Sequence, residues 1–205
     1  NRGRMVVMRT GKIERKSLET HVKVETNLDE YGMVDIESGI GFFDHMLTLF
    51  AMHGGFNLKV HCIGDLQVDG HHSVEDIGIV IGKAFKQALG QRKGINRYGN
   101  AFVPMDESLT HISLDISGRP YLHLEVPKLS KLVGDFDTQL LEEFLRAFSI
   151  HLGLTLHVRV LYGENTHHII EGIFKALGRA IKQAIYIDIS SNKRDTIPST
   201  KGILD

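Results

Sequence analysis

Cysteine is almost missing from this sequence, and its scarcity limits the class of protein. Cys62 is the single cysteine in 205 residues, so an internal disulfide framework is excluded and a reducing compartment, the cytoplasm, is expected. No apolar run reaches the length that spans a membrane, and no signal-peptide core lies near the start. A membrane partner is therefore not expected.

An excess of charge of one sign is also missing. Lysine and arginine number 24 and aspartate and glutamate 25, which gives a formal net charge of −1. This balance provides no basic field for nucleic acid and no acidic excess of the kind found in disordered chains. The apolar share of 42% is ordinary for a globular protein, and the length suits one domain or two small fused ones.

Histidine, in contrast, is abundant, with twelve copies. Four of them form two copies of the pattern His-His-x-x-Glu, which reads HHSVE at residues 71–75 and HHIIE at residues 167–171. Each copy opens a helical pattern, and the two patterns end similarly, in KAFKQAL at residues 83–89 and RAIKQAI at residues 179–185. Imidazoles and a carboxylate at this spacing are ligands that a borderline divalent metal prefers.

Helix geometry separates the two histidines of each motif. His71 and Glu75 share a helix face, whereas His72 points roughly 100° away from His71. One metal cannot easily take both neighbours, so each motif is expected to serve two metals, or two sites shared between subunits. The alternative for a single pair is a helix start with solvated imidazoles, but two copies in matching halves favour metal binding.

The two motifs belong to a longer internal repeat. THVKVE at residues 20–25 matches THISLD at residues 110–115, and under the same alignment Glu143 falls on His45. Each half is predicted to run strand, strand, helix, strand, helix, with the first-half helices at residues 42–53 and 71–89. The predicted fold class is α+β, a tandem repeat of two similar half-domains, each a mixed β-sheet with helices packed on one face.

The repeat also predicts the organisation of the chain. The first half is expected to cover residues 5–92, the second half residues 93–190, and a polar C-terminal tail residues 191–205, with both halves in one compact unit. Residues 5–15 are weakly patterned and basic, so no strand is predicted there. Glu19 is placed on a strand at residues 18–25, with its side chain facing solvent.

The residues themselves predict a set of metal ligands with nitrogen and oxygen donors. Without a thiolate, this set favours Mn²⁺, Fe²⁺ or Zn²⁺ over a structural cysteine–zinc site. Divided over two metals, it leaves open positions for water or substrate. For His45 alone, the alternative is a partly buried helix histidine, but its correspondence with Glu143 favours a ligand. The predicted set is His45, His71, His72, Glu75, Glu143, His167, His168 and Glu171.

Candidates for phosphate binding are weaker one by one. Arginine and lysine bind phosphate well, yet each alone is more often a solvated surface charge. Taken from the pattern alone, His53 is a helix-end residue, and Ser199 offers only a hydroxyl in a loop. The basic candidates are Arg97, Arg119, Lys175 and Lys201.

Five separated segments, in order, make the chain resemble one known family. The resemblance extends from about residue 15 to residue 202 and is to the imidazoleglycerol-phosphate dehydratases. The segments are GIGFFDHM (39–46), VDGHHSVEDIG (68–78), DISGRP (115–120), GENTHHIIEGIFK (163–175) and PSTKG (198–202).

The resemblance implies an activity and an assembly. It implies dehydration of D-erythro-imidazoleglycerol phosphate to imidazole-acetol phosphate in histidine biosynthesis. It also implies two Mn²⁺ ions in each active site, held between subunits of a hollow twenty-four-subunit shell built from trimers. In this family the metals hold the substrate imidazole as an imidazolate-like ring, and a hydroxyl leaves as water through a diazafulvene-like intermediate.

The resemblance further implies roles for individual residues. Glu19 matches the acid/base carboxylate of the family and joins His45, His72 and Glu171 as a candidate catalytic residue. Gly70 stands where many relatives carry an acidic residue, and Glu143 stands where some carry histidine, although a carboxylate still ligates manganese. The candidates for substrate and phosphate binding are Arg97, Arg119, Lys175, Ser199, Lys201 and His53.

Two other functions compatible with the metal ligands stay open at this point. One is a binuclear metal-dependent hydrolase acting on a phosphate or an amide. The other is a metal-storage or shell-forming protein without catalytic activity. None of these three functions requires nucleic acid or a membrane as a partner.

Overall fold

The computed structural model describes residues 8–188 and 195–204. The domain boundaries expected at residues 5, 190 and 191 lie outside the described residues, as does part of the expected tail. Within the described residues, no helix is both long enough and apolar enough to cross a membrane.

The first half is a four-stranded sheet with two helices. The strands lie in the order β1-β2-β4-β3, in which β3 runs parallel to β4 and the other pairs are antiparallel. In chain order the elements are β1 (Thr10–Lys16), β2 (Thr20–Asn27), β3 (Val34–Glu37), α1 (Gly41–Gly54), β4 (Asn57–Gly64) and α2 (His71–Leu89).

The second half has the same topology. Its sheet has the order β5-β6-β10-β7, again with one parallel pair, between β7 and β10. A short hairpin, β8 (Leu132–Val133) and β9 (Phe136–Asp137), precedes its first helix. The other elements are β5 (Tyr98–Met105), β6 (Ser108–Asp115), β7 (Tyr121–Glu125), α3 (Leu140–Leu152), β10 (Thr155–Tyr162) and α4 (Thr166–Ile185). The predicted α+β repeat is confirmed.

Each sheet contains one strand more than the sequence pattern predicted, and the second half also adds the β8–β9 hairpin. The additional sheet strands, β1 and β5, are the outer strands next to β2 and β6. The inward positions of β1 include a glycine and Arg15, whereas β5 has apolar side chains on both faces, with Tyr98 and Phe102 exposed. Gly11 packs on the backbone of Ala84 in α2, and Gly99 packs on that of Ala180 in α4, where a Cβ would overlap the helix. The hydrophobic alternation is therefore weak in both strands. Glu19, predicted on a strand, lies in the bend between β1 and β2.

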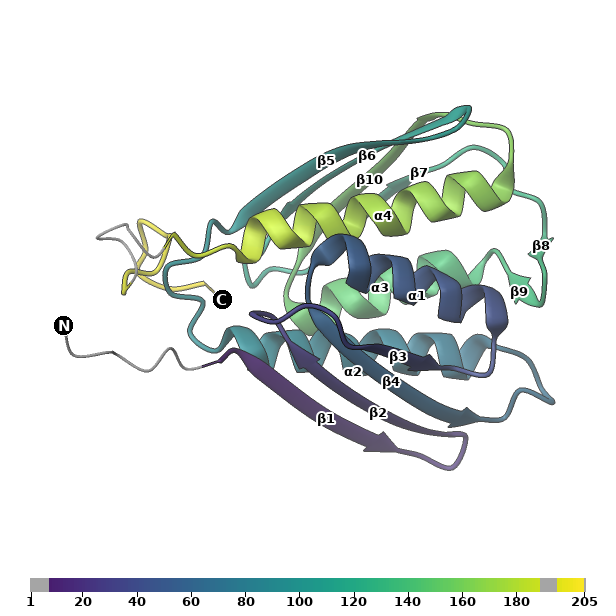
Figure 1. The fold of residues 1–205 in the computed structure, drawn as a ribbon, viewed down its shortest axis with the longest axis horizontal. Coiled ribbons are helices and arrows are strands. Elements are labelled where there is room, and N and C mark those ends of the chain that lie inside the picture. The colour runs from purple at the N-terminus through teal and green to yellow at the C-terminus, as the bar shows by residue number, and fades with distance from the viewer. Residues whose placement is uncertain (1–7, 189–194, 205) are drawn as a thin grey trace.

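The four long helices lie between the two sheets (Figure 1). α2 covers β1 and β2, and α4 covers β5 and β6, so each sheet buries one face on a helix of its own half. The halves then meet through their helices, with α1 on α4 and α3 on α2. As a result, each motif-bearing helix has a helix of the other half as its neighbour.

Phenylalanines from all four helices fill the space between the sheets. Phe50 of α1 contacts Phe85 of α2 and Phe148 of α3, with ring centroids 5.9 and 5.8 Å apart. Phe144 of α3 contacts Phe174 of α4 at 5.4 Å. These rings are fully buried, and aromatic contacts of this kind contribute about 0.5–1.5 kcal/mol per pair beyond area burial. The core is thus shared by both halves.

Two glycines allow the helices of opposite halves to approach closely. A Cβ on Gly178 of α4 would lie 2.5 Å from the Phe50 carbonyl oxygen of α1, and a Cβ on Gly82 of α2 would lie 2.9 Å from that of Phe148 in α3. Both glycines sit at the same place in the repeat, eleven residues after the first histidine of each motif. The distance between the helices, and with it the position of the motifs, depends on these contacts.

Replacing Gly178 with alanine is expected to destabilise the protein. The added methyl overlaps backbone that cannot move alone, a strain of about 1–3 kcal/mol. This strain outweighs the gain in helix propensity of up to about 1 kcal/mol. Chemical denaturation should show a lower free energy of unfolding for Gly178→Ala. Gly41→Ala should remain close to the parent, because apart from neighbouring backbone of its own helix no described atom lies within 4 Å of the place its Cβ would take. Equal stability of the two variants would contradict this account of the helix crossing.

Candidate metal centres

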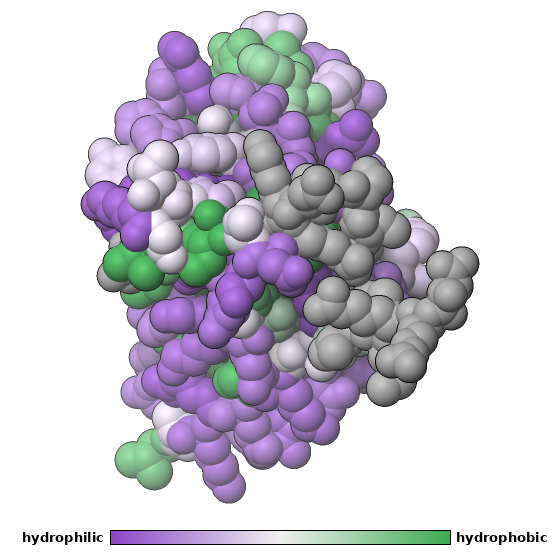
Figure 2. Space-filling view, turned by 90° about the vertical axis from the view of Figure 1, so that its left-hand side faces the viewer, coloured by the Kyte–Doolittle hydropathy of each residue, from purple (hydrophilic) through white to green (hydrophobic). Residues whose placement is uncertain are grey.

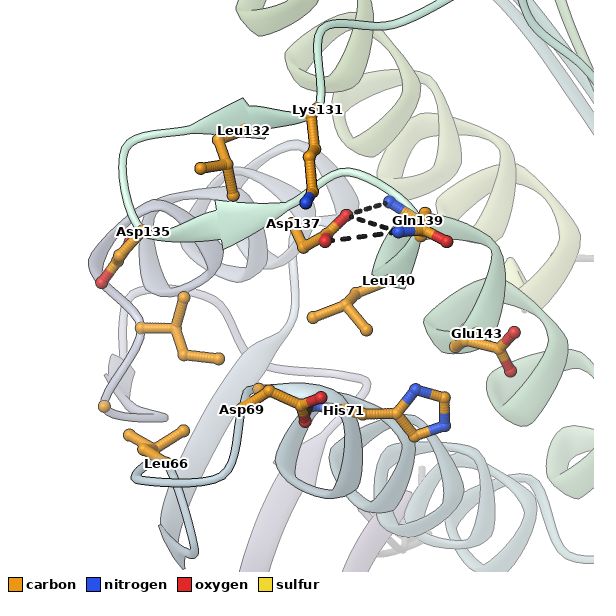
Figure 3. Close-up of a pocket in the computed structure, with 13 residues that line it drawn as sticks. Leu66, Asp69, His71, Lys131, Leu132, Asp135, Asp137, Gln139, Leu140 and Glu143 are labelled. Atoms are coloured by element: carbon orange, nitrogen blue, oxygen red, sulfur yellow. Dashed lines mark hydrogen bonds between the residues drawn. The ribbon is translucent and has the colours of Figure 1, made fainter.

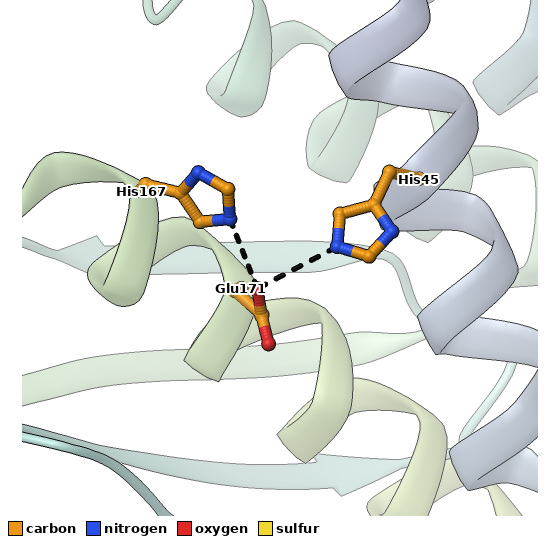
Figure 4. Close-up of side chains that lie close together, drawn as sticks. All are labelled: His45, His167 and Glu171. Carbon is orange, nitrogen blue, oxygen red and sulfur yellow. Dashed lines mark hydrogen bonds and ion pairs between the residues drawn. The ribbon is translucent and has the colours of Figure 1, made fainter.

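The start of α4 carries the first group of ligand-type side chains. Asn165 caps the helix by accepting hydrogen bonds from the backbone N–H groups of His167 and His168. One turn further on, Glu171 Oε2 lies 3.0 Å from His167 Nε2, and α1 brings His45 Nε2 to 3.6 Å from the same oxygen. One ligand atom from each of the three residues lies within 4.8 Å of the others (Figure 4). We call these three residues the first group.

Glu171 is the buried member of the first group. Its side chain is 9% exposed, and burial alone would raise the pKa of the carboxyl group. Lys175 Nζ, 2.6 Å from Glu171 Oε1, and the His167 ring more than offset this effect, so the pKa of Glu171 lies below its ordinary value. The carboxylate is therefore ionised, as a metal ligand must be.

The second group consists of His71 and Glu75, at the start of α2, and Glu143, at the start of α3. Asp69 accepts a hydrogen bond from the His71 backbone N–H, and His71 Nε2 lies 3.6 Å from Glu75 Oε2. Glu143, in the first turn of α3, lines the same cavity of about 700 Å³ as His71 (Figure 3). The two groups correspond through the repeat, with Glu143 in the place of His45.

The two groups differ in how closely they assemble. Among the described residues, only the first group brings three ligand atoms within 4.8 Å. The second group is more open and contains two carboxylates in place of one. Both groups join a motif helix to the first helix of the other half.

The second histidine of each motif lies away from these groups. His72 Nδ1 is 2.9 Å from Asp65 Oδ2, and its Nε2 is 3.7 Å from Glu19 Oε1. The hydrogen bond with Asp65 raises the pKa of His72. His71 and His72 have different partners, Glu75 for His71 and Asp65 for His72, and their ring centroids lie 6.1 Å apart.

His168 has an equivalent environment built from different residues. Its Nδ1 is 2.7 Å from Glu107 Oε2, and its Nε2 is 3.7 Å from Asp106 Oδ2. The hydrogen bond with Glu107 raises the pKa of His168. His168 and the Asn165 backbone N–H together lower the pKa of Glu107 to about 2.

Arg97 lies close to the C-terminal tail. It binds Asp115 through two hydrogen bonds of 2.7 and 3.0 Å and donates a third, of 2.9 Å, to the Pro198 carbonyl oxygen. Ser199 is half-buried and Lys201 exposed. This end of the molecule, seen face-on in Figure 2, is largely hydrophilic.

The remaining substrate candidates are spread over other elements. Arg119 is exposed in the turn before β7, and Lys175 pairs with Glu171. His53, at the end of α1, lines a cavity of about 630 Å³ with Arg179 and Lys182. Burial, Lys175 and Arg179 lower the pKa of His53.

A single chain keeps the tail and the first group apart. The Arg97 backbone N–H donates to the Ala184 carbonyl oxygen, at the C-terminal end of α4, whereas His167 lies at its N-terminal end. Seventeen residues of helix separate Ala184 from His167, which at 1.5 Å per residue is about 25 Å. Arg97 and the tail that it contacts are therefore not brought to the first group within one protomer.

Three carboxylates around the second histidines were not recognised in the sequence: Asp65, Asp106 and Glu107. Asp106 and Glu107 lie in the turn between β5 and β6, about 60 residues before His168, whereas Asp65 lies in the loop after β4, seven residues before His72. No spacing rule connects either position with its histidine, because a loop of irregular backbone lies between Asp65 and His72. The only available signal was the repeat, which places the β5–β6 turn in the position of the β1–β2 turn that holds Glu19.

The first group fits a divalent cation by its chemistry. Two imidazole nitrogens and one ionised carboxylate oxygen lie within 4.8 Å of one another. Such mixed donors suit Mn²⁺, Fe²⁺ or Zn²⁺ and leave room for further ligands.

Comparisons with known proteins agree with this geometry. The family model described as imidazoleglycerol-phosphate dehydratase matches residues 38–181. Proteins of that name from Caldanaerobacter subterraneus subsp. tengcongensis and Desulforamulus reducens are each 56% identical over 197 residues, which is 96% of this chain and 100% and 98% of theirs.

Solved structures agree as well. The Staphylococcus aureus imidazoleglycerol-phosphate dehydratase superposes with a TM-score of 0.80 at 41% identity, over 87% of this chain and 99% of that one. The Pyrococcus furiosus protein, solved in complex with (S)-C348, gives 0.79 at 35% identity, over 94% and 100%. A family model that covers most of the chain, relatives over nearly its whole length and the shared fold lead to one conclusion: the chain belongs to the imidazoleglycerol-phosphate dehydratase family of hydro-lyases.

Proposed function

We propose that this chain converts imidazoleglycerol phosphate to imidazole-acetol phosphate, using two divalent cations, Mn²⁺ in the first instance, in sites completed by neighbouring protomers. The observation that carries the proposal is the close approach of His45, His167 and Glu171, three donors from two helices and both halves. Family membership supports the reaction, a dehydration in histidine biosynthesis.

The eight donors predicted from the sequence would hold the metals. His45, His167 and Glu171 supply one triad, and His71, Glu75 and Glu143 supply the other. His72 and His168 point away from both triads, so within the proposal they bind the metals of adjacent protomers. Three donors from one protomer and one from another give the roughly four protein ligands expected for each ion.

Proton movement in the reaction requires a carboxylate near the substrate carbons. Bound cations supply Lewis acidity that lowers the pKa of the substrate imidazole and so favours loss of the hydroxyl group from the adjoining carbon. Glu19 lies 3.7 Å from His72 Nε2, and its side chain is half-exposed. In the proposal Glu19 accepts the proton from the carbon that becomes the enol and returns a proton during formation of the ketone.

The residues assigned to phosphate and substrate binding do not lie together within one chain. Arg119, Ser199 and Lys201, with Arg97 holding the tail, would bind it from one protomer, and Lys175 and His53 would bind it from another. An imidazole and a phosphate joined by a short glycerol chain cannot reach across about 25 Å of helix. This separation supports active sites between protomers, and with them the twenty-four-subunit shell of trimers that the family resemblance implies. A cytoplasmic location stays a prediction.

The overall reaction is tested by metal removal and return. Protein treated with a strong chelator should lose dehydration of imidazoleglycerol phosphate, and Mn²⁺ should restore it, because the imidazole then regains its Lewis acid. The enol/ketone product absorbs in the ultraviolet after addition of alkali. Release of inorganic phosphate in place of this product would favour the alternative of a binuclear hydrolase, and metal binding without either product would favour a storage protein.

Replacing Glu19 with glutamine tests the proton-transfer role. A neutral amide cannot accept the proton, so kcat should fall by about 10²–10⁴-fold. Metal content and assembly should be unchanged because Glu19 is not among the proposed ligands. Glu14→Gln is the matched control, since Glu14 is an exposed carboxylate on β1 of the same hairpin, paired with His21. Parent-like turnover of the Glu19 variant would remove this residue from the mechanism.

Glu143 allows the second triad to be tested separately. Glu143→Ala should reduce bound Mn²⁺, measured by elemental analysis after dialysis, by up to about one ion per protomer, because a triad that loses one donor binds more weakly. Glu143→His supplies an imidazole in place of the carboxylate, as His45 does in the first triad, and should retain the ion. Unchanged metal content in the alanine variant would exclude Glu143 as a ligand.

A further inference from the structure

His72 and His168 differ from the other histidines of the proposed ligand set. The difference is the ring nitrogen that lies nearest to a carboxylate. His45 and His167 turn Nε2 toward Glu171, and His71 turns Nε2 toward Glu75, all proposed ligands themselves. In contrast, His72 and His168 hold their nearest carboxylate at Nδ1, at 2.9 and 2.7 Å, and the carboxylates nearest to their Nε2 atoms lie 3.7 Å away.

The Nδ1 contact determines what Nε2 can do. A carboxylate accepts a hydrogen bond, so the proton of the neutral ring is held on Nδ1 and the lone pair is left on Nε2. Carboxylates in this position fix the tautomer and orientation of metal-binding histidines and increase their basicity. Asp65 Oδ2 is 2.9 Å from His72 Nδ1, and Glu107 Oε2 is 2.7 Å from His168 Nδ1.

Burial of Asp65 is not explained by the fold alone. Its side chain is 16% exposed, and among the described residues no hydrogen-bond partner reaches its buried Oδ1. Among the described residues, His72 is the only side chain that hydrogen-bonds the Asp65 carboxylate. An unsatisfied buried oxygen costs stability, and such groups in native proteins call for a functional explanation.

Glu107 is fixed in a different way. Its Oε1 accepts hydrogen bonds from the backbone N–H groups of Glu164 and Asn165, at 3.2 and 2.8 Å. Asn165 is also the residue that caps α4. The carboxylate that contacts His168 is thereby held by the same loop that sets the start of the motif helix.

Asp65 and Glu107 are not equivalent positions of the repeat. Asp65 follows β4, whose counterpart is β10, whereas Glu107 lies between β5 and β6, the counterpart of the β1–β2 turn. Copying one half onto the other would not produce both contacts. The same arrangement of carboxylate and Nδ1 is built twice from different elements.

We propose that Asp65 and Glu107 are positioning residues of the metal centres, which hold His72 and His168 with Nε2 free and aimed at an ion. Neither carboxylate touches the ion or the substrate. The inference rests on the proposed function, in which His72 and His168 are ligands.

The test measures Mn²⁺ affinity of the metal-free full-length protein by chelator competition. Asp65→Asn and Glu107→Gln keep size and hydrogen-bonding capacity but remove the charge. Each should weaken binding by about 10–100-fold. Exposed carboxylates on the outer strands provide matched controls, and Asp35→Asn on β3 and Glu125→Gln on β7 should leave affinity unchanged.

A double-variant cycle separates positioning from a general structural effect. If Asp65 acts through His72, Asp65→Asn should weaken Mn²⁺ binding in the parent but not in a His72→Ala background, and Glu107→Gln should behave likewise with His168→Ala. Equal losses in both backgrounds, or parent-like affinity of both single variants, would overturn the proposal.

If His72→Ala and His168→Ala themselves leave metal stoichiometry and affinity unchanged, the ligand assignment fails instead. If Asp65→Asn does not fold, the Glu107 cycle gives the same decision, because the amide oxygen introduced by Glu107→Gln still accepts the backbone hydrogen bonds.

Discussion

The first group of ligand-type side chains depends on the close packing of α1 against α4. His45 comes from one half of the repeat and His167 and Glu171 come from the other, so the spacing of these two helices sets the distance between the donors. Gly178 permits this spacing, because any side chain there would meet the Phe50 carbonyl oxygen. Backbone contact between helices is rigid in a way that contact between side chains is not. The packing of α1 on α4 therefore keeps the three ligand atoms within 4.8 Å of one another.

Pairing helices across halves explains why a duplicated sequence forms centres that neither half forms alone. In each half, the motif helix covers its own sheet, and the other helix packs against the opposite motif helix. Each triad consequently needs both copies of the repeat. Divergence between the copies is then possible at a single position, as in the replacement of His45 by Glu143 in the second triad, without disturbing the sheet or the helix.

Much of this arrangement followed from the sequence where a local rule applied. The bounds of α2, His71–Leu89, were predicted from its period, and the separation of His71 from His72 followed from helix geometry. Strand β1 was not predicted because a glycine and charged residues weaken its alternation, and β5 was not predicted because it has apolar side chains on both faces. The contact of Glu107 with His168 was not predicted because the two residues are 61 positions apart and meet only after strands and helices have packed. The contact of Asp65 with His72 spans seven residues, but the loop between them has no periodicity from which it could be predicted.

The orientation of the histidines links the fold of one protomer to the need for others. Carboxylates of the same chain face three imidazoles through Nε2, so these donors converge inside the protomer. In the other two imidazoles Nδ1 is hydrogen-bonded, and the described part of the same chain offers Nε2 only Glu19 and Asp106, each at 3.7 Å. Under the proposed function, these two Nε2 atoms would serve ions that are held largely by other protomers. Each chain would then contribute two triads and two further donors, and protomers that exchange these donors would complete both centres.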